Sequence, residues 1–208
     1  MGRCTSINRL LCFVFLQWAC SGAFALDGDR KGFSLGLGMG AHGSTLNSSS
    51  NKSGTDSFEF KASEKKAFTG LSSDFKLGYG LTSDLEVHLF NKATWSVLNT
   101  SDNDYVFTLS GAYGVSATLF VPFGKPQLWP SAPFVSAGYG FSFFSVPSRQ
   151  WLSPFEGRAS FVGLGYEFER HKRLQLDVMW GSSRDTESSQ LIEKDFLSFI
   201  LSLSIVAY

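Results

Sequence analysis

Cysteines and long apolar runs are scarce in this chain, and each scarcity removes a class of protein. Of the 208 residues only three are cysteine, Cys4, Cys12 and Cys20, and all lie near the N-terminus. The rest of the chain therefore has neither a disulfide framework nor a thiolate metal site. No later segment reaches the run of about 18 apolar residues that a transmembrane helix requires. Small disulfide-stabilised secreted domains and helical membrane proteins are both excluded.

An excess of charge of either sign is also lacking. The chain carries 18 Lys plus Arg against 18 Asp plus Glu, a formal net charge of +0, so no basic surface for nucleic acid is expected. Glycine and phenylalanine, by contrast, each occur 21 times. This composition, without a helical span, favours β-strands.

The N-terminus has the features of an export signal. Arg3 and Arg9 form a basic region, the apolar stretch LLCFVFLQWA (10–19) follows, and Ala23-Phe24-Ala25 is a cleavage site of the A-x-A type. We expect residues 1–25 to be a cleaved signal peptide and residues 26–208 to form one exported domain.

The stretch GFSLGLGMGAHGST contains a G-x-G-x-x-G motif at Gly38, Gly40 and Gly43, the pattern of a dinucleotide-binding loop. Such a loop must follow a strand and begin a helix, which supplies the N–H groups that bind phosphate. The following residues, STLNSSSNKSGTDS, have no helical period. We therefore interpret these glycines as part of a strand, and no cofactor is expected.

Alternation of apolar with polar or small residues dominates the chain. In LSSDFKLGYGL, Leu71, Phe75 and Leu77 share one face, while Asp74 and Lys76 lie on the other. The same pattern predicts eight strands, at 33–41, 71–81, 85–97, 105–121, 134–146, 158–170, 174–181 and 196–208. The class is therefore all-β.

Two architectures suit eight such strands, a soluble barrel or sandwich with the apolar face inside and a membrane barrel with that face outside. Gly, Ser, Asp and Lys would make a poor soluble core, but they suit the narrow lumen of an eight-stranded membrane barrel. The connections are expected to alternate in length, as in outer-membrane barrels. The outer ones are 42–66, 99–104, 147–157 and 185–195, and the inner ones are 82–84, 122–130 and 171–173. The sequence therefore predicts an eight-stranded antiparallel up-and-down transmembrane β-barrel with a sealed polar interior.

The chain resembles the small outer-membrane β-barrel proteins of the OmpA-like and OmpX-like class. The resemblance rests on the hairpins GYGL-TSD-LEV and GLGYEFERHKRLQLDV and on the terminal aromatic Tyr208. It implies a monomer in the Gram-negative outer membrane, in contact with lipid and lipopolysaccharide. It also implies that Tyr208 is an assembly signal for the barrel assembly machinery, although Tyr208 is out of phase with Leu201, Leu203 and Ile205.

Charged residues on the inward faces predict an interior ion network. A three-residue turn at 82–84 places Asp74 opposite Lys92, and a turn at HKR places Glu167 opposite Asp177. Two facing carboxylates need cations, and Lys76 and Lys92 on the opposite wall are the expected ones. The predicted network comprises Asp74, Lys76, Glu86, His88, Lys92, Glu167, Glu169 and Asp177. We interpret it as a plug that fixes the strand register, the alternative being a gated ion path.

Tyrosine and tryptophan on the outward faces are typical of the aromatic girdle at membrane interfaces. We assign this role to Tyr79, Trp95, Tyr139, Tyr166 and Trp180. No metal site and no catalytic residue are expected.

The expected function is a non-catalytic one, in envelope integrity or in surface interaction such as adhesion through the outer loops. One alternative is a lipid A-modifying enzyme. His42, with Ser101, Asp102 and Asp104, resembles the arrangement in acyltransferase barrels. The other alternative is a small-solute channel of the OmpW-like type, which the interior charges disfavour.

Overall fold

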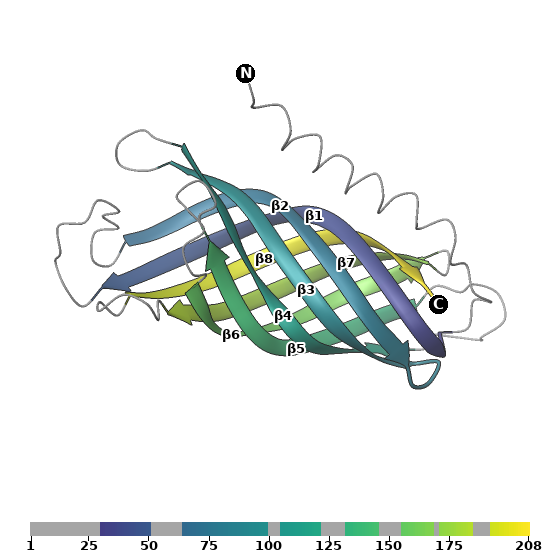
Figure 1. The fold of residues 1–208 in the computed structure, drawn as a ribbon. Helices are drawn as coiled ribbons and strands as arrows, with labels where there is room; N and C mark the ends of the chain where they lie inside the picture. Colours follow the sequence, from purple (N-terminus) through teal and green to yellow (C-terminus); the bar gives the residue numbers. More distant parts are fainter. Residues whose placement is uncertain are drawn as a thin grey trace, which may run out of the picture.

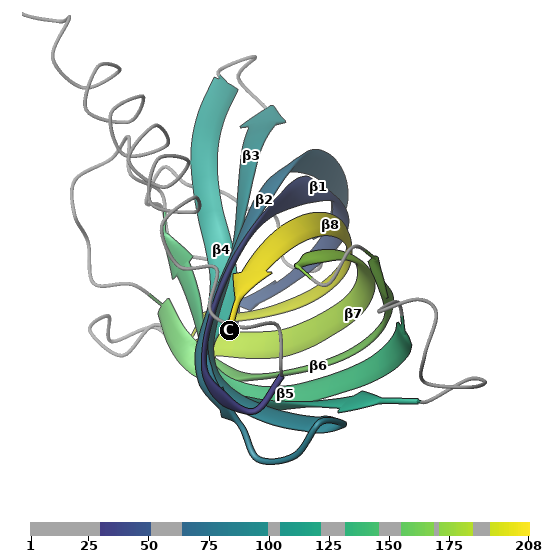
Figure 2. The same cartoon turned by 90° about the vertical axis from the view of Figure 1, so that its right-hand side faces the viewer.

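The structure is a computed structural model that describes residues 30–50, 64–99, 105–121, 132–145, 155–168, 171–184 and 192–208. Its eight strands are β1 (Gly32–Ser50), β2 (Glu64–Gly80), β3 (Leu85–Asn99), β4 (Tyr105–Phe120), β5 (Ala132–Ser145), β6 (Phe155–Phe168), β7 (Lys172–Arg184) and β8 (Ile192–Ala207). Each strand pairs antiparallel with its neighbours in sequence, and β1 also pairs with β8, so the sheet closes into a barrel (Figures 1 and 2). The predicted fold class is confirmed.

The strands are longer than a hydrocarbon layer requires. They run from 13 residues in β7 to 19 residues in β1, whereas about 9–11 tilted residues span a bilayer. The expectation that an outer loop begins at His42 is wrong, because β1 continues to Ser50 and β2 begins at Glu64. Polar residues such as Ser44 and Asn47 keep the extended conformation here because each pairs with β2 and β8.

The turn between β2 and β3 fixes the register of that hairpin. The backbone N–H of Leu81 donates to the carbonyl of Leu85 at 2.9 Å. The Thr82 hydroxyl oxygen accepts from the N–H groups of Asp84 and Leu85 at 3.2 and 3.0 Å. We call the end of the barrel that carries this turn the turn end, and the opposite end the loop end. The C-terminus lies at the turn end (Figure 1).

The outward surface of the barrel is apolar over all eight strands. Alternate residues of each strand point outward, and many large apolar side chains are 40–66% exposed, including Leu71, Leu89, Val115, Phe141, Leu164 and Leu203. A water-soluble barrel would bury this surface, whereas a lipid bilayer solvates it. The predicted orientation of the apolar face is confirmed. Within the described residues, no helix is long and apolar enough to cross a membrane.

The lumen is not lined by small and polar residues alone, which corrects the predicted polar interior. A cluster of buried apolar side chains occupies it, comprising Leu46, Phe68, Phe90, Ala112, Phe144, Ala159, Phe161, Met179, Phe196 and Ile200. A second cluster of Phe120, Ala132 and Phe134 lies near the turn end. The Phe90 and Phe161 rings meet edge-to-face with centroids 4.9 Å apart. Many inward glycines leave room for these rings, as at Gly138, where an added Cβ would lie 2.2 Å from the Phe161 ring.

Candidate functional site in the barrel lumen

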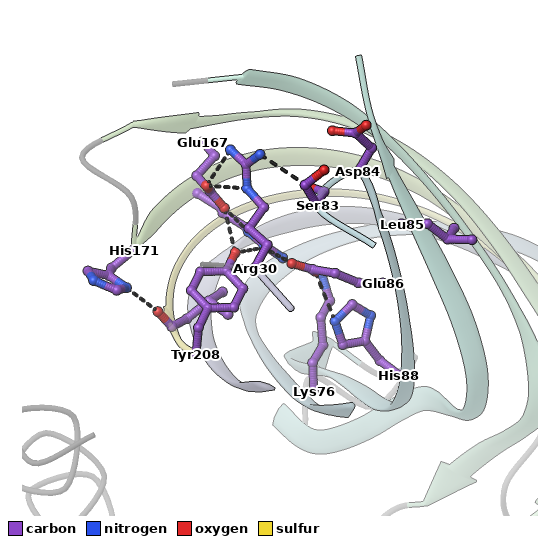
Figure 3. A network of polar contacts seen from close by, with 12 residues as sticks. Arg30, Lys76, Ser83, Asp84, Leu85, Glu86, His88, Glu167, His171 and Tyr208 are labelled. Carbon is purple, nitrogen blue, oxygen red and sulfur yellow. Dashed lines mark hydrogen bonds and ion pairs between the residues drawn. The ribbon is translucent and has the colours of Figure 1, made fainter. Parts of the chain in front are cut away.

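A compact ion network lies inside the turn end of the barrel, and we call it the mouth cluster (Figure 3). Arg173 of β7 is its centre, with none of its surface exposed. Its guanidinium donates to both carboxylate oxygens of Glu86 at 2.9 and 2.7 Å, and its Nε donates to Glu167 at 2.7 Å. The Tyr208 hydroxyl accepts from Arg173 and donates to Glu167 at 2.7 Å. Bidentate pairing of this kind is the strongest arrangement open to an arginine.

Arg30, just before β1, extends the mouth cluster toward solvent. Its Nε and Nη2 lie 2.9 and 2.8 Å from Oε1 of Glu167, and its side chain is 18% exposed. Its guanidinium also lies 4.0 Å from the centroid of the Phe120 ring, which Arg173 approaches at 4.9 Å. The Arg30 side chain therefore links the residues just before β1 to Glu167 of β6 at the turn end.

The second group, the central cluster, joins opposite walls of the lumen. Lys92 Nζ lies 2.9 Å from Asp74 Oδ2 and 2.7 Å from Asp177 Oδ2. Lys76 Nζ lies 3.5 Å from the same Asp74 oxygen and donates to Gln175 Oε1 at 2.8 Å. Gln175 in turn donates to Asp177 Oδ1 at 2.5 Å. Each of these side chains is almost fully buried, so the network is shielded from screening by salt.

The register corrects one predicted contact and agrees with another. Asp74 pairs with Lys92 across β2 and β3, as predicted. Glu167, however, lies opposite Arg173 and not opposite Asp177, whose partner across β6 and β7 is Gly163. The β6–β7 connection is shifted by two residues from the expected HKR turn. Because the shift is of two residues, the same side chains still point inward, and the alternation of the sequence could not reveal it. The shift replaces the repulsive Glu167–Asp177 contact by the Glu167–Arg173 ion pair.

The ion-paired charges of the described lumen balance. Arg30, Lys76, Lys92 and Arg173 are matched by Asp74, Glu86, Glu167 and Asp177. His88, also predicted, is buried with Nε2 3.1 Å from Glu86 Oε2. Glu169 lies outside the described residues. Balanced pairing matters because an uncompensated buried charge costs several kcal/mol.

A third group, the hydroxyl cluster, lies on the loop-end side of the central cluster. His42 is 4% exposed, and its Nε2 lies 2.9 Å from the Ser96 hydroxyl. Its Nδ1 lies 2.7 Å from the hydroxyl of Ser44, which donates to Ser198 at 2.7 Å. His42 Nε2 also lies 3.4 Å from the carbonyl oxygen of Trp95, so the imidazole contacts hydroxyl groups through both nitrogens and a backbone acceptor through Nε2. Gly70 separates His42 from Ser96 in the register, and its missing side chain allows the contact.

Four residues of these clusters were missed by the sequence analysis. Arg173 was assigned to a turn, and Arg30 and Gln175 were not considered. Tyr208 was expected only as an assembly signal, but its ring is 3% exposed and points into the lumen, in keeping with its phase. The inward faces predicted from the sequence carry more carboxylates than cations, and this excess is the signal that could have pointed to Arg173. Among the described residues, no group of three or more His, Cys, Asp or Glu is arranged to hold a metal ion.

The five predicted girdle aromatics all point outward. Tyr79 and Tyr139 are 57% exposed, while Tyr166 and Trp180 are 48% and 43% exposed. Trp95 is partly covered by the Phe107 ring, and its indole N–H donates to the Ser73 hydroxyl at 3.3 Å. Tyr79 and Tyr166 lie near the turn end, Trp95 lies toward the loop end and Tyr139 lies in the middle of β5, and the girdle role of these residues stays a prediction.

Comparisons with known proteins identify the class by its fold. No model of a known protein family matches the chain, and no curated protein matches its sequence. The crystal structure of Neisserial surface protein A is similar with a TM-score of 0.50 and 17% identity, over 85% of this chain and 97% of that one. The outer membrane protein OprG from Pseudomonas aeruginosa gives a TM-score of 0.48 at 12% identity, over 87% and 99% of the two chains. The outer membrane protein AlkL gives 0.48 at 16% identity, over 87% and 92%. The similarity to Neisserial surface protein A, together with the closed ring of eight strands and the apolar outer face, defines the fold as that of the small eight-stranded outer-membrane β-barrels.

Proposed function

We propose that this protein is an integral outer-membrane barrel with a closed lumen, which serves the cell envelope as a structural or surface-interaction protein. The apolar outer face supports integration into a bilayer. The signal peptide predicted at residues 1–25 supports export. In the orientation we propose, the turn end faces the periplasm and the loop end faces outward. Outer-membrane lipid, lipopolysaccharide and, during biogenesis, the barrel assembly machinery are the expected partners of the monomer.

One observation carries this proposal: the lumen is blocked at several levels along its axis. The mouth cluster closes the turn end with paired charges, and the central cluster joins opposite walls through Lys92. The Phe90–Phe161 contact lies beside it, with Lys92 Nζ 4.9 Å from the Phe161 centroid. A solute would have to break buried ion pairs to pass, at a cost of several kcal/mol each. The described lumen therefore supports the plug hypothesis over the small-solute channel.

Planar bilayer recording tests the closed lumen directly. We expect the purified protein to give no discrete conductance steps, even after Lys92→Met removes one cation from the plug. Stable steps from the unaltered protein would contradict the proposal.

Cell fractionation tests the location of the protein, and mass spectrometry of the mature N-terminus tests cleavage. We expect recovery in the outer membrane fraction and a mature chain that starts at Leu26.

A surface role is tested by altering the loop end alone. We expect replacement of residues 51–63 by a Gly-Ser linker to leave the heat-modifiable folded form intact while reducing attachment of expressing cells to host-cell or matrix surfaces. If cells that lack the whole protein become more sensitive to detergent while the linker variant has no effect, the structural role is favoured. No phenotype in either strain would contradict both roles.

One observation favours a second candidate, the lipid-modifying enzyme. The Ser96 hydroxyl lies 2.9 Å from His42 Nε2, which is the spatial relation of a nucleophile to its base. This pairing replaces the expected one with Ser101, Asp102 and Asp104, which lie outside the described residues. An enzyme predicts a change in lipid A mass on expression that is lost in His42→Ala and Ser96→Ala. An unchanged lipid A spectrum would eliminate it.

A further inference from the structure

One amide side chain, that of Asn91, lies in the middle of the apolar outer face of the barrel. It is exposed and lies near the middle of β3. Apolar residues occupy the three outward positions on either side of it, at Leu85, Val87 and Leu89 toward the turn end and at Ala93, Trp95 and Val97 toward the loop end. Three such steps cover about 20 Å of strand, or about 14 Å along the membrane normal at a tilt of about 45°. The hydrocarbon layer is about 30 Å thick, so Asn91 lies near its midplane when the barrel is inserted.

The other outward amides and charges whose side chains the structure describes lie close to strand ends. Asn47, Arg158 and Asp195 lie toward the loop end of β1, β6 and β8, and Lys172 begins β7 at the turn end. Water and lipid headgroups solvate such positions at the two membrane interfaces. Neither reaches the midplane, so Asn91 lacks the solvation that these side chains have.

The Asn91 carboxamide also has no hydrogen-bond partner among the described residues. Across β2 and β4 it faces Phe75 and Tyr113, which are 40% and 42% exposed. Hydrocarbon neither donates nor accepts hydrogen bonds, so an amide left in it keeps the full cost of its lost hydration. The position of Asn91 therefore favours a partner inside the membrane that offers both a donor and an acceptor.

A second copy of the same chain meets this requirement. A carboxamide has two donor hydrogens and one acceptor oxygen, so two Asn91 side chains can satisfy each other through a pair of hydrogen bonds. A twofold axis along the membrane normal keeps both barrels in the same orientation and brings the two side chains to the same depth. Acyl chains offer no polar group there, and apolar contact alone selects no partner in lipid, because acyl chains are as apolar as leucine.

We propose that Asn91 and the exposed side chains around it, Phe75, Leu89 and Tyr113, form a docking surface for a second copy of the chain. The folded monomers pair side by side in the membrane, with the two amides at the centre of the contact and the apolar side chains packed around them. Each pair presents two sets of outer loops together, which increases avidity for a surface with repeated targets. This consequence rests on the proposed surface role, whereas the pairing itself does not.

Crosslinking in a membrane tests the pairing. Residues 26–208 contain no cysteine, so a single introduced thiol reports on one position. Leu89→Cys places a thiol one outward step from Asn91 and leaves the amide intact, while Leu176→Cys is the matched control on β7, across the ring. The two leucines are similarly exposed, at 60% and 52%. Each variant is inserted into vesicles of phosphatidylethanolamine and phosphatidylglycerol and treated with a short bismaleimide, and heat-modifiability verifies that the barrel is folded.

We expect a crosslinked dimer from Leu89→Cys and a much lower yield from Leu176→Cys. Adding Asn91→Leu to Leu89→Cys should remove most of the dimer while the barrel stays folded, because leucine suits the apolar face. Equal yields at the two positions indicate random collision and overturn the proposal, and so does a yield from Leu89→Cys that Asn91→Leu leaves unchanged. In outer-membrane preparations, a crosslink to a protein of different mass in place of the dimer also overturns it, because the occupant is then another protein.

Sedimentation equilibrium in density-matched detergent provides a second measurement, on the protein without an introduced thiol. We expect a reversible equilibrium between monomer and dimer, with a dissociation constant that rises about tenfold in Asn91→Leu, the change that two membrane hydrogen bonds of ordinary strength supply. A monomer at every concentration, or equal constants for the two proteins, overturns the proposal. Attachment of cells is measured separately with the linker variant, so a failure of the pairing is distinguished from a failure of the surface role.

Discussion

Lys92 is the residue whose replacement tests the plug most directly. Its ammonium group bridges Asp74 at 2.9 Å and Asp177 at 2.7 Å, and the side chains of the three residues are at most 5% exposed. Lys92→Met keeps an unbranched side chain of similar length but leaves the two carboxylates without their shared cation. Asp74 keeps Lys76 at 3.5 Å, and Asp177 keeps the hydrogen bond from the Gln175 amide.

The expected magnitude follows from removing one partner of a buried ion pair, which costs about 3–5 kcal/mol. For a domain of this size 1 kcal/mol corresponds to a shift of about 2–4 °C, so we expect the unfolding temperature to fall by roughly 6–20 °C. Leu89→Ala is the control, because Leu89 is 60% exposed on the outward face and its truncation creates no cavity in the lumen. We expect its effect in detergent to be within about 0.5 kcal/mol.

Heat-modifiability on gels and circular dichroism of the refolded protein in detergent measure both variants. The double variant Lys92→Met, Asp177→Asn removes one cation and one carboxylate and leaves Asp74 paired with Lys76, so it should recover at least half of the lost stability. An effect of Lys92→Met no larger than that of Leu89→Ala would refute the reasoning. A double variant less stable than Lys92→Met alone would show that the cost is not electrostatic.

Two further predictions concern packing and the C-terminus. A Cβ at Gly70 would lie 1.9 Å from the carbonyl oxygen of Trp95, so Gly70→Ala should destabilise the barrel by more than 1 kcal/mol, whereas Gly43→Ala, with nothing within 4 Å, should be near neutral. Equal unfolding temperatures for the two variants would contradict the described register. Tyr208→Phe removes the hydroxyl that bonds Glu167 and should cost about 1–3 kcal/mol while the yield of inserted barrel is unchanged. If inserted barrel is lost in that variant but its stability is not, the aromatic residue acts in assembly and not in the folded plug.

The order and direction of the strands could be predicted from the sequence because a strand exposes alternate residues to opposite sides. Leu71, Phe75 and Leu77 had to share one face and Asp74 and Lys76 the other, whatever the rest of the chain did. The short TSD turn then fixed the Asp74–Lys92 pair. The outward apolar belt followed from the same alternation, because a narrow lumen cannot hold so many large side chains.

Alternation could not predict which side chains meet inside the barrel. A two-residue shift at the β6–β7 connection leaves every residue on its own face, so the pairing of Glu167 with Arg173 became visible only in the register. Phe90, at an inward position with Asn91 outward, departs from the binary pattern; it lies opposite Gly114 of β4 and packs edge-to-face against the Phe161 ring.

What the sequence determined by itself is local: eight strands, their two faces and one tight hairpin, each set by residues close together in the chain. The tertiary structure decided the contacts that close the lumen, such as Lys92 with Asp177 and Arg173 with Glu86. These partners lie on strands far apart in sequence, and only the closure of β8 onto β1 brings the opposite walls within hydrogen-bonding distance.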